Sequence, residues 1–236
     1  MEPIVIKNKL RKISKDFHLK YDPGWFNLMW VSKRHARYLE YMGMCFDPIY
    51  TRFGKTEEDR IKNIDKFETS KQFKKIKHEF SGQAITKEEV VKGMKYCQKI
   101  KDSDLRKELL DLYKNIKKKL KKNNLALLTQ TNNKGQKAVL LNSILFHEWL
   151  HLLLIKNRIY FKSISDKYWK YDEGLVTYFE YYSSKRLNYL ESIKNKIKYP
   201  SQRVYFIYAI KFRGLMKIEK NSQKRKKIII DLMNSL

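Results

Sequence analysis

The segment at residues 142–155, N-S-I-L-F-H-E-W-L-H-L-L-L-I, constrains this chain most, because it is almost wholly apolar and yet carries His147, Glu148 and His151. Its length and composition predict a buried helix. Ionisable side chains left unpaired in an apolar interior cost several kcal/mol each. The three groups therefore need partners, neutralisation or a metal ion, and the His-Glu-x-x-His spacing favours the metal ion.

Helical geometry assigns these residues different tasks. Side chains four residues apart lie on one face, with Cβ atoms about 5–6 Å apart, so His147 and His151 can each direct a ring nitrogen to one zinc ion at about 2.0–2.1 Å. Glu148 lies about 100° further round the helix, where it can hold the water bound to that ion. Zinc lowers the pKa of bound water towards about 7, and Glu148 can accept its proton and deliver it to a leaving amine. The motif predicts peptide-bond hydrolysis by zinc-bound water that Glu148 activates.

A catalytic zinc ion needs a third protein ligand and an open fourth position. No histidine follows His151, which excludes zinc peptidases with three histidine ligands and leaves a carboxylate as the expected third ligand. We select Glu173, because Gly174 beside it would let two helices approach closely around an ion. The carboxylates considered are Asp166, Asp172, Glu173 and Glu180.

Two motifs together resemble the gluzincin class of zinc peptidases. H-E-W-L-H at 147–151 is followed by Y-D-E-G-L-V-T-Y-F-E at 171–180, with 21 residues between His151 and Glu173. In gluzincins such as the thermolysin-like and aminopeptidase families, the third ligand is a glutamate in an N-E-G-x-x-x-Y-x-E-like helix. The resemblance covers about 40 residues. It implies a zincin-like fold, a Zn²⁺ cofactor, His147, His151 and Glu173 as its ligands, and Glu148 as the general base.

The chain also departs from the pattern of those families. The spacing to Glu173 is slightly longer than in the large aminopeptidases, and Asp172 stands where they usually have asparagine. Their G-x-M-E-N segment, which binds a free amino end, is absent, so aminopeptidase specificity is not implied and endo- and exopeptidase action both stay open. Thr177 replaces the aspartate that orients a ligand histidine in thermolysin-like enzymes, so that histidine must be oriented differently. The resemblance is closer to small, compact gluzincins.

Gluzincins also tend to stabilise the tetrahedral oxyanion with a downstream tyrosine or histidine. Four residues are candidates for that task, and the sequence does not choose among them. They are Tyr199, Arg203, Tyr205 and Tyr208.

The remaining patterns predict an α+β, helix-rich fold. Thr86 and Glu89 form a capping-box pattern that opens a helix to about residue 100, and an apolar stripe of Leu105, Leu109, Leu112, Ile116 and Leu120 predicts a second helix after Asp102-Ser103. Residues 125–131 and 136–140 are expected to form a β-hairpin, after which Asn142 or Ser143 would cap the helix of the His-Glu-x-x-His motif.

We place the domain boundary near residue 123. A mostly helical region (1–122) precedes a zincin-like region with a small sheet (123–236). The sequence leaves open whether the first half is an inhibitory pro-segment, a substrate-binding subdomain or half of one core. It also leaves the oligomeric state open.

The chain is strongly basic, with 52 Lys and Arg against 25 Asp and Glu among 236 residues, for a formal charge of +27. Such a charge attracts phosphate backbones, anionic membranes or acidic proteins. The lysines of 114–122 lie opposite a leucine stripe, which favours a solvated helix face over a nucleic-acid site. The alternative function is a basic nucleic-acid-binding or assembly protein with a structural or vestigial zinc site. We favour a peptide or protein substrate.

The N-terminal sequence and the cysteines indicate the expected cellular compartment of the protein. Residues 1–20 carry several basic side chains and lack the apolar core of a signal peptide, and no apolar run is long enough to span a bilayer. Cys45 and Cys97 lie far apart in the sequence, which suggests neither a disulfide framework nor a thiolate zinc site. We expect a cytoplasmic protein without a transmembrane segment.

Overall fold

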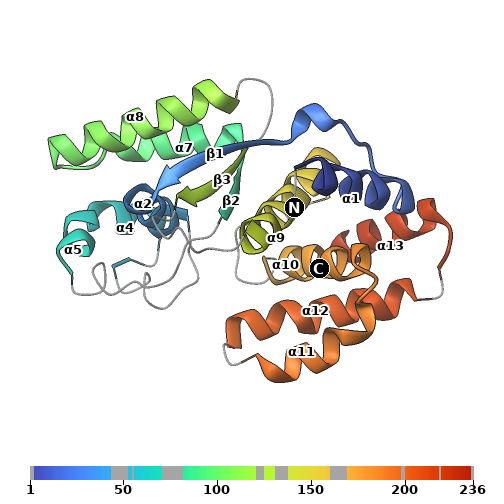
Figure 1. Ribbon diagram of the computed structural model, residues 1–236. Coiled ribbons are helices and arrows are strands. Elements are labelled where there is room, and N and C mark those ends of the chain that lie inside the picture. Colours follow the sequence, from blue (N-terminus) through green and yellow to red (C-terminus); the bar gives the residue numbers. More distant parts are fainter. Residues whose placement is uncertain are drawn as a thin grey trace. The chain divides into compact units, whose positions relative to one another are not determined.

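The computed structural model describes residues 3–43, 53–54, 56–70, 82–120, 125–130, 138–159, 169–197, 200–217 and 219–234. Most of these residues are helical, and three short strands form one sheet, so the expectation of a helix-rich fold with few strands is confirmed (Figure 1). The chain divides into two compact units. One consists of Met1–Pro23 and Ala138–Leu236, and the other of Gly24–Lys137.

The unit Gly24–Lys137 contains the sheet, whose strand order is β1-β3-β2. Its strands are β1 (Asn27–Ser32), β2 (Gly82–Ile85) and β3 (Leu125–Gln130). The central strand β3 pairs with β1 in parallel, with Asn27 opposite Leu125, and with β2 antiparallel, with Ile85 opposite Leu125. All three strands are supplied by segments far apart in the sequence.

The helices of this unit enclose an apolar core. The paired helices α7 and α8 are shown in green in Figure 1, and both α8 and α2 contact the sheet. Tyr41 stacks on Phe67 with ring centroids 3.9 Å apart, and both side chains are fully buried. The helices are α2 (Lys33–Gly43), α4 (Glu57–Lys62), α5 (Ile64–Thr69), α7 (Lys87–Cys97) and α8 (Ser103–Leu120), and a 3-10 turn lies at Pro23–Trp25.

Both helix predictions in this unit are confirmed. The Thr86 hydroxyl accepts from the backbone N–H of Glu89, and the Glu89 carboxylate accepts from that of Thr86, which makes a complete capping box at the start of α7. In α8 the predicted stripe, Leu105, Leu109, Leu112, Ile116 and Leu120, is buried. The lysines opposite it at 114 and 117–119 are exposed, while the predicted basic positions 121 and 122 lie outside the described residues.

The other unit is built from helices. The most extensive packing joins α10 to α12, and α9 packs on both α10 and α1. Its elements are α1 (Pro3–Asp16), α9 (Ala138–Lys156), α10 (Trp169–Ser183), a 3-10 turn at Leu187–Tyr189, α11 (Leu190–Lys196), α12 (Pro200–Met216) and α13 (Ser222–Asn234).

The N-terminal helix α1 belongs to this second unit. Its buried stripe of Ile6, Leu10, Ile13 and Phe17 recurs at helical spacing, which gives α1 an apolar face to pack against other helices. Phe17 lies edge-on to Phe179, with centroids 4.8 Å apart. The first residues of the chain therefore complete the core that surrounds the His-Glu-x-x-His helix.

Three helices of this unit end in the same way. After α10, Lys185 adopts φ 57°, the Lys185 N–H donates to the Tyr182 carbonyl at 3.0 Å, and the Arg186 N–H donates to the Tyr181 carbonyl at 2.8 Å. This is a Schellman ending, in which glycine is the usual left-handed residue. His18 after α1 and Arg158 after α9 have positive φ of 51° and 57° and equivalent bonds.

Three expectations about residues 123–143 are wrong. The expected hairpin of 125–131 and 136–140 is wrong, because residues 138–140 lie in α9 and the partners of β3 among the described residues are β1 and β2, while 131, 136 and 137 lie outside the described residues. Asn142 and Ser143 do not cap α9, since both lie inside it. The units divide after Pro23 and before Ala138, not near residue 123, because α1 packs with α9 and α10 and because β3 pairs with strands from earlier in the chain.

Candidate metal centre

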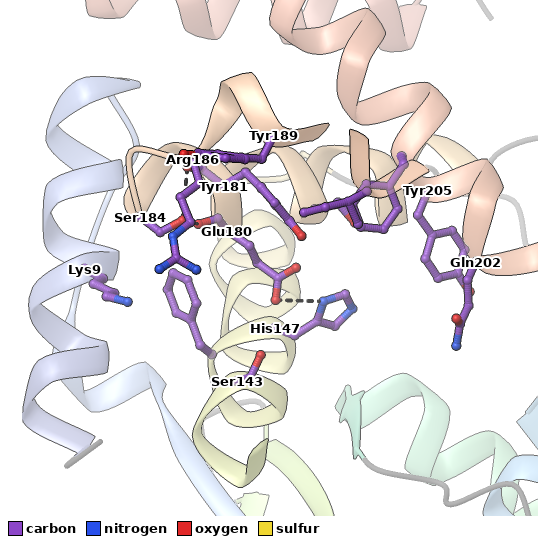
Figure 2. A pocket seen from close by; sticks show the side chains of 14 residues that line it. Lys9, Ser143, His147, Glu180, Tyr181, Ser184, Arg186, Tyr189, Gln202 and Tyr205 are labelled. Carbon is purple, nitrogen blue, oxygen red and sulfur yellow. Dashed lines mark hydrogen bonds and ion pairs between the residues drawn. The ribbon is translucent and has the colours of Figure 1, made fainter. Parts of the chain in front are cut away.

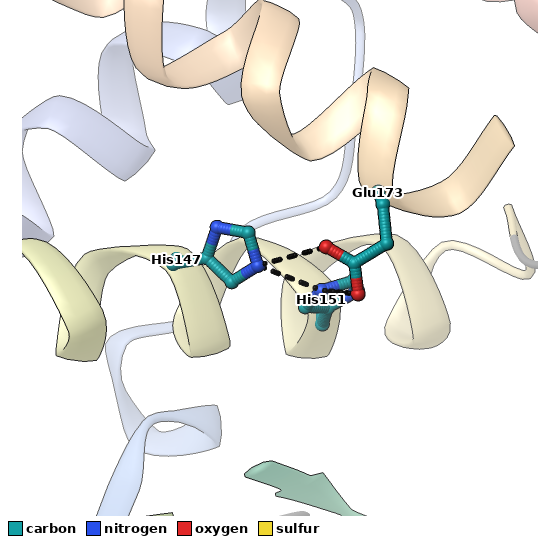
Figure 3. A group of neighbouring side chains, drawn as sticks. All are labelled: His147, His151 and Glu173. Carbon is teal, nitrogen blue, oxygen red and sulfur yellow. Dashed lines mark hydrogen bonds and ion pairs between the residues drawn. The ribbon is translucent and has the colours of Figure 1, made fainter. Parts of the chain in front are cut away.

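The three predicted ligands come from two packed helices, α9 and α10. Between residues 145 and 154, α9 is mostly buried, and a more open stripe along this part of the helix includes Ile144, His147, His151 and Ile155. The spacing of this stripe, three then four residues, follows the helical repeat, so both histidines project from one face. Glu173 projects from α10 towards them, as Figure 3 shows.

The two ring nitrogens and the Glu173 carboxylate form a compact cluster. The Nε2 atoms of His147 and His151 are 3.3 Å apart. Glu173 places Oε2 3.1 Å from the first Nε2 and Oε1 3.5 Å from the second. Two atoms bound to one zinc ion at about 2.0–2.1 Å and at the tetrahedral angle lie about 3.3–3.4 Å apart. The separation of the two ring nitrogens therefore matches that of two ligands on one zinc ion, and one ligand atom from each of the three residues lies within 4.8 Å of the others.

Electrostatics explains why these groups tolerate burial. Burial alone would lower the pKa of His147, but hydrogen bonds and charges from Glu173 and Glu180 outweigh it and hold that pKa well above its usual range. Burial likewise opposes the charge on His151, and Glu173 more than compensates and raises its pKa. Burial would raise the pKa of Glu173, but the histidines hold it far below its ordinary value. The cluster is thus a site where proton and metal binding compete.

Glu180 supplies the orienting contact that the sequence did not assign. Its Oε1 lies 3.3 Å from Nδ1 of His147, the ring nitrogen that does not face Glu173 (Figure 2). A carboxylate on the second nitrogen holds the imidazole ring and makes the first nitrogen a better ligand. Glu180 follows Glu173 by seven residues, two helical turns, and this spacing was the signal that could have revealed the contact. Glu180 was instead considered as a third ligand.

Glu148 follows His147 in α9 and belongs to the buried residues of that helix, with only 8% of its surface exposed. Its charge contributes to the raised pKa of His151, so the carboxylate lies close to the cluster. Among the described residues, the group of side chains able to hold a metal ion is His147, His151 and Glu173, without Glu148. Glu148 is thus outside the candidate ligand group, and its role as general base stays a prediction.

Gly174 does permit a close helix approach, but the second helix is α12. A Cβ atom built on Gly174 would lie 2.3 Å from Cβ of Tyr208 and 3.2 Å from the Tyr208 backbone. Tyr208 also packs on Tyr171, with ring centroids 4.4 Å apart. Glycine at this position therefore brings α12 against the start of α10, one residue from Glu173.

The close packing of α12 on α10 also places Tyr205 of α12 near the site. Burial and the nearby charge of Glu173 raise the pKa of Tyr205, so its phenol keeps its proton. Of the other oxyanion candidates, Arg203 is exposed and Tyr208 packs against Gly174 and Tyr171. Tyr199 lies outside the described residues, as does the carboxylate candidate Asp166.

A cavity of about 810 Å³ opens beside His147. Side chains from α1, α9, α10, α11, α12 and the turn after α10 line it, and Tyr205 and Gln202 lie on one side of His147 while Lys9 and Arg186 lie on the other (Figure 2). Thr177, the residue that replaces the aspartate of thermolysin-like enzymes, also lines this cavity. A ligand in the cavity would therefore lie against one of the candidate metal ligands.

Comparisons of this chain with protein-family models, with curated proteins and with solved structures found no match. Within the helices that the structure describes, none combines the length and apolar character needed to cross a bilayer.

Proposed function

We propose that this chain is a zinc-dependent peptidase of the gluzincin type that hydrolyses peptide bonds. The observation that carries the proposal is the cluster of His147, His151 and Glu173, in which the two Nε2 atoms lie 3.3 Å apart and each faces a different oxygen of the Glu173 carboxylate, at 3.1 and 3.5 Å. Two imidazoles and one carboxylate are the donor set of one class of catalytic zinc sites, which keep a fourth position for water or substrate. In this proposal α9 and α10 correspond to the two ligand-bearing helices of a zincin-like fold.

The donor set fits zinc on a second observation as well. Two partly buried imidazoles have their Nε2 atoms 3.3 Å apart and share one carboxylate, so protons on both rings would repel each other. A divalent ion held between the two imidazoles and the Glu173 carboxylate would bind all three groups in their deprotonated forms. Bound zinc would polarise the scissile carbonyl and lower the pKa of the attacking water.

The protein's own residues would do the remaining work. Glu148 accepts a proton from the attacking water and passes it to the leaving amine. Glu180 holds the ring of His147 in its ligating orientation through the 3.3 Å contact at Nδ1. The protonated phenol of Tyr205 donates a hydrogen bond to the oxyanion that develops on the attacked carbonyl. The substrate is a peptide or an unfolded protein segment, and we keep the cytoplasm as its expected location.

The test combines metal content with cleavage of an unfolded protein substrate. Wild-type protein should bind one zinc ion and cleave the substrate. Glu148→Gln should keep the zinc and lose hydrolysis, because the amide cannot accept the proton. His147→Ala should lose both. Zinc content that is unchanged when His147 or Glu173 is replaced would show that the site assignment is wrong.

A further inference from the structure

The cavity beside His147 is lined by two chemically different groups of side chains. One group is apolar and aromatic, with Phe146 from α9, Tyr181 from α10, Ile193 from α11 and Phe206 from α12. Tyr181 and Phe206 meet edge to face, with ring centroids 5.6 Å apart. A lining of this kind accepts an apolar or aromatic side chain.

The other group is cationic and consists of Lys9 and Arg186. Among the described residues, no carboxylate lies within ion-pair distance of either cation. Glu180, the acidic side chain of the described lining, is already held by His147 at 3.3 Å. The cavity therefore carries positive charge without a paired carboxylate.

Local structure holds both cations at the cavity. Arg186 follows α10 directly, and the Schellman bonds at Tyr181 and Tyr182 fix its backbone. The Arg186 charge reaches the Tyr181 phenol, where it opposes the rise in pKa that burial and Glu180 cause. The Lys9 ammonium lies 5.4 Å from the ring centroid of Phe146. Arg186 is exposed, but its backbone is fixed at the end of α10, and Lys9 lies over the Phe146 ring, so both cations belong to the lining of the cavity.

We propose that this cavity selects peptides in which a carboxylate lies next to a large apolar side chain. The apolar side chain packs on Tyr181 and Phe206, and the carboxylate binds Arg186 and Lys9. Charge-assisted bonds from guanidinium and ammonium groups to a carboxylate are stronger than neutral hydrogen bonds. The carboxylate can belong to an acidic side chain or to the C-terminus of the peptide. The inference rests on the proposed peptidase function, since it assigns the substrate class of the same site.

Binding to the zinc-loaded Glu148→Gln protein tests the proposal without requiring cleavage. Three probes carry a dansyl group at the amino end. The first is Ala-Ala-Phe-Glu-Ala with an amidated C-terminus, the second is Ala-Ala-Phe-Gln-Ala with an amidated C-terminus, and the third is Ala-Ala-Phe-Gln-Ala with a free carboxylate. We expect at least one carboxylate probe to bind about tenfold or more tightly than the neutral probe. The probe that does so identifies the source of the carboxylate.

Charge variants then locate the preference. Arg186→Gln and Lys9→Gln, added to the Glu148→Gln background, should each reduce the preference, whereas Arg186→Lys should retain part of it. Lys185→Gln is the matched control, because it removes one positive charge at the neighbouring position and does not line the cavity. Circular dichroism confirms that each variant is folded.

The outcomes separate this inference from the peptidase proposal. Equal affinity for the three probes overturns the inference, and so does a preference that Lys185→Gln reduces as much as Arg186→Gln, since that result reports only the overall positive charge. A carboxylate preference that depends on Arg186 supports the inference even if the wild-type protein cleaves nothing. In that case the peptidase proposal fails and the ligand site stands.

Discussion

His147 is held by carboxylates at both ring nitrogens: Glu173 lies 3.1 Å from Nε2, and Glu180 lies 3.3 Å from Nδ1. Both carboxylates come from α10, two helical turns apart. One helix therefore supplies a candidate metal ligand, Glu173, and the group that orients the candidate ligand His147. This arrangement gives each glutamate a separate and testable role.

Glu180→Gln should weaken zinc binding by about 10- to 100-fold, because the amide cannot give the His147 ring the same negative partner. Competition with a chelating dye measures the change. The matched control is Glu191→Gln, which removes an exposed carboxylate paired with Arg213 away from the site. Equal affinity in wild type and Glu180→Gln would show that the contact does not orient the ligand.

Zinc binding should release protons and strengthen as pH rises. In the metal-free protein, burial opposes the charge on His147, but Glu173 and Glu180 raise its pKa well above the usual range, so the ring keeps its proton to higher pH than an ordinary histidine. That proton must leave when a metal binds. The ion pairs stabilise the metal-free fold below the ordinary histidine pKa, and this stability is lost as pH rises through the raised pKa.

Calorimetric titration of zinc in two buffers with different ionisation enthalpies measures the released protons. The same titration at about pH 6 and about pH 8 should give the tighter binding at the higher pH. A zinc affinity that does not change over this interval would contradict the presence of a proton on His147 in the metal-free protein.

Tyr205→Phe should lower kcat by about 100-fold while zinc content stays at the wild-type level, because the lost phenol would donate to the oxyanion and not to the metal. Steady-state kinetics with one peptide substrate measures the effect. Tyr208→Phe is the control, since it keeps the ring that packs on Gly174 and Tyr171. A fall in kcat that is equal in the two variants would argue against a special role for Tyr205.

Gly174→Ala should reduce the free energy of unfolding by about 1–3 kcal/mol, because the added methyl group would meet Tyr208 at 2.3 Å and force α10 and α12 apart. Chemical denaturation measures this change. Gly214→Ala in α12 has no atom within 4 Å of the added Cβ and should instead stabilise the helix by about 0.5–1 kcal/mol. The opposite signs distinguish steric overlap from helix propensity.

His18→Gly should stabilise the protein by about 1 kcal/mol, since His18 is exposed and has φ 51°, a conformation that glycine adopts without the steric cost of a Cβ atom. Thermal and chemical unfolding measure the gain. His18→Ala removes the ring but retains Cβ and should not reproduce it. A gain of the same size in both variants would locate the cost in the imidazole ring and not in the backbone.

Local patterns predicted several elements well. The capping box at Thr86 and the stripe from Leu105 to Leu120 specify α7 and α8, because both signals are contained within a few helical turns. The same holds for His147 and His151, whose spacing alone places both rings on one face. The hairpin prediction failed because apolar residues near 138–140 suit a strand and a buried helix equally, and only packing decides between them.

The sequence by itself determined the face shared by His147 and His151, the nearby position of Glu148, and the need for a carboxylate beyond His151, since helical periodicity and residue chemistry are local. Only the tertiary structure decided that α10 directs Glu173 to both imidazoles and Glu180 to Nδ1 of His147. It also decided that α1 completes the surrounding core and that Gly174 brings Tyr205 towards Glu173. These relationships join segments far apart in the chain, and their packing free energy depends on which helices meet, which no local spacing records.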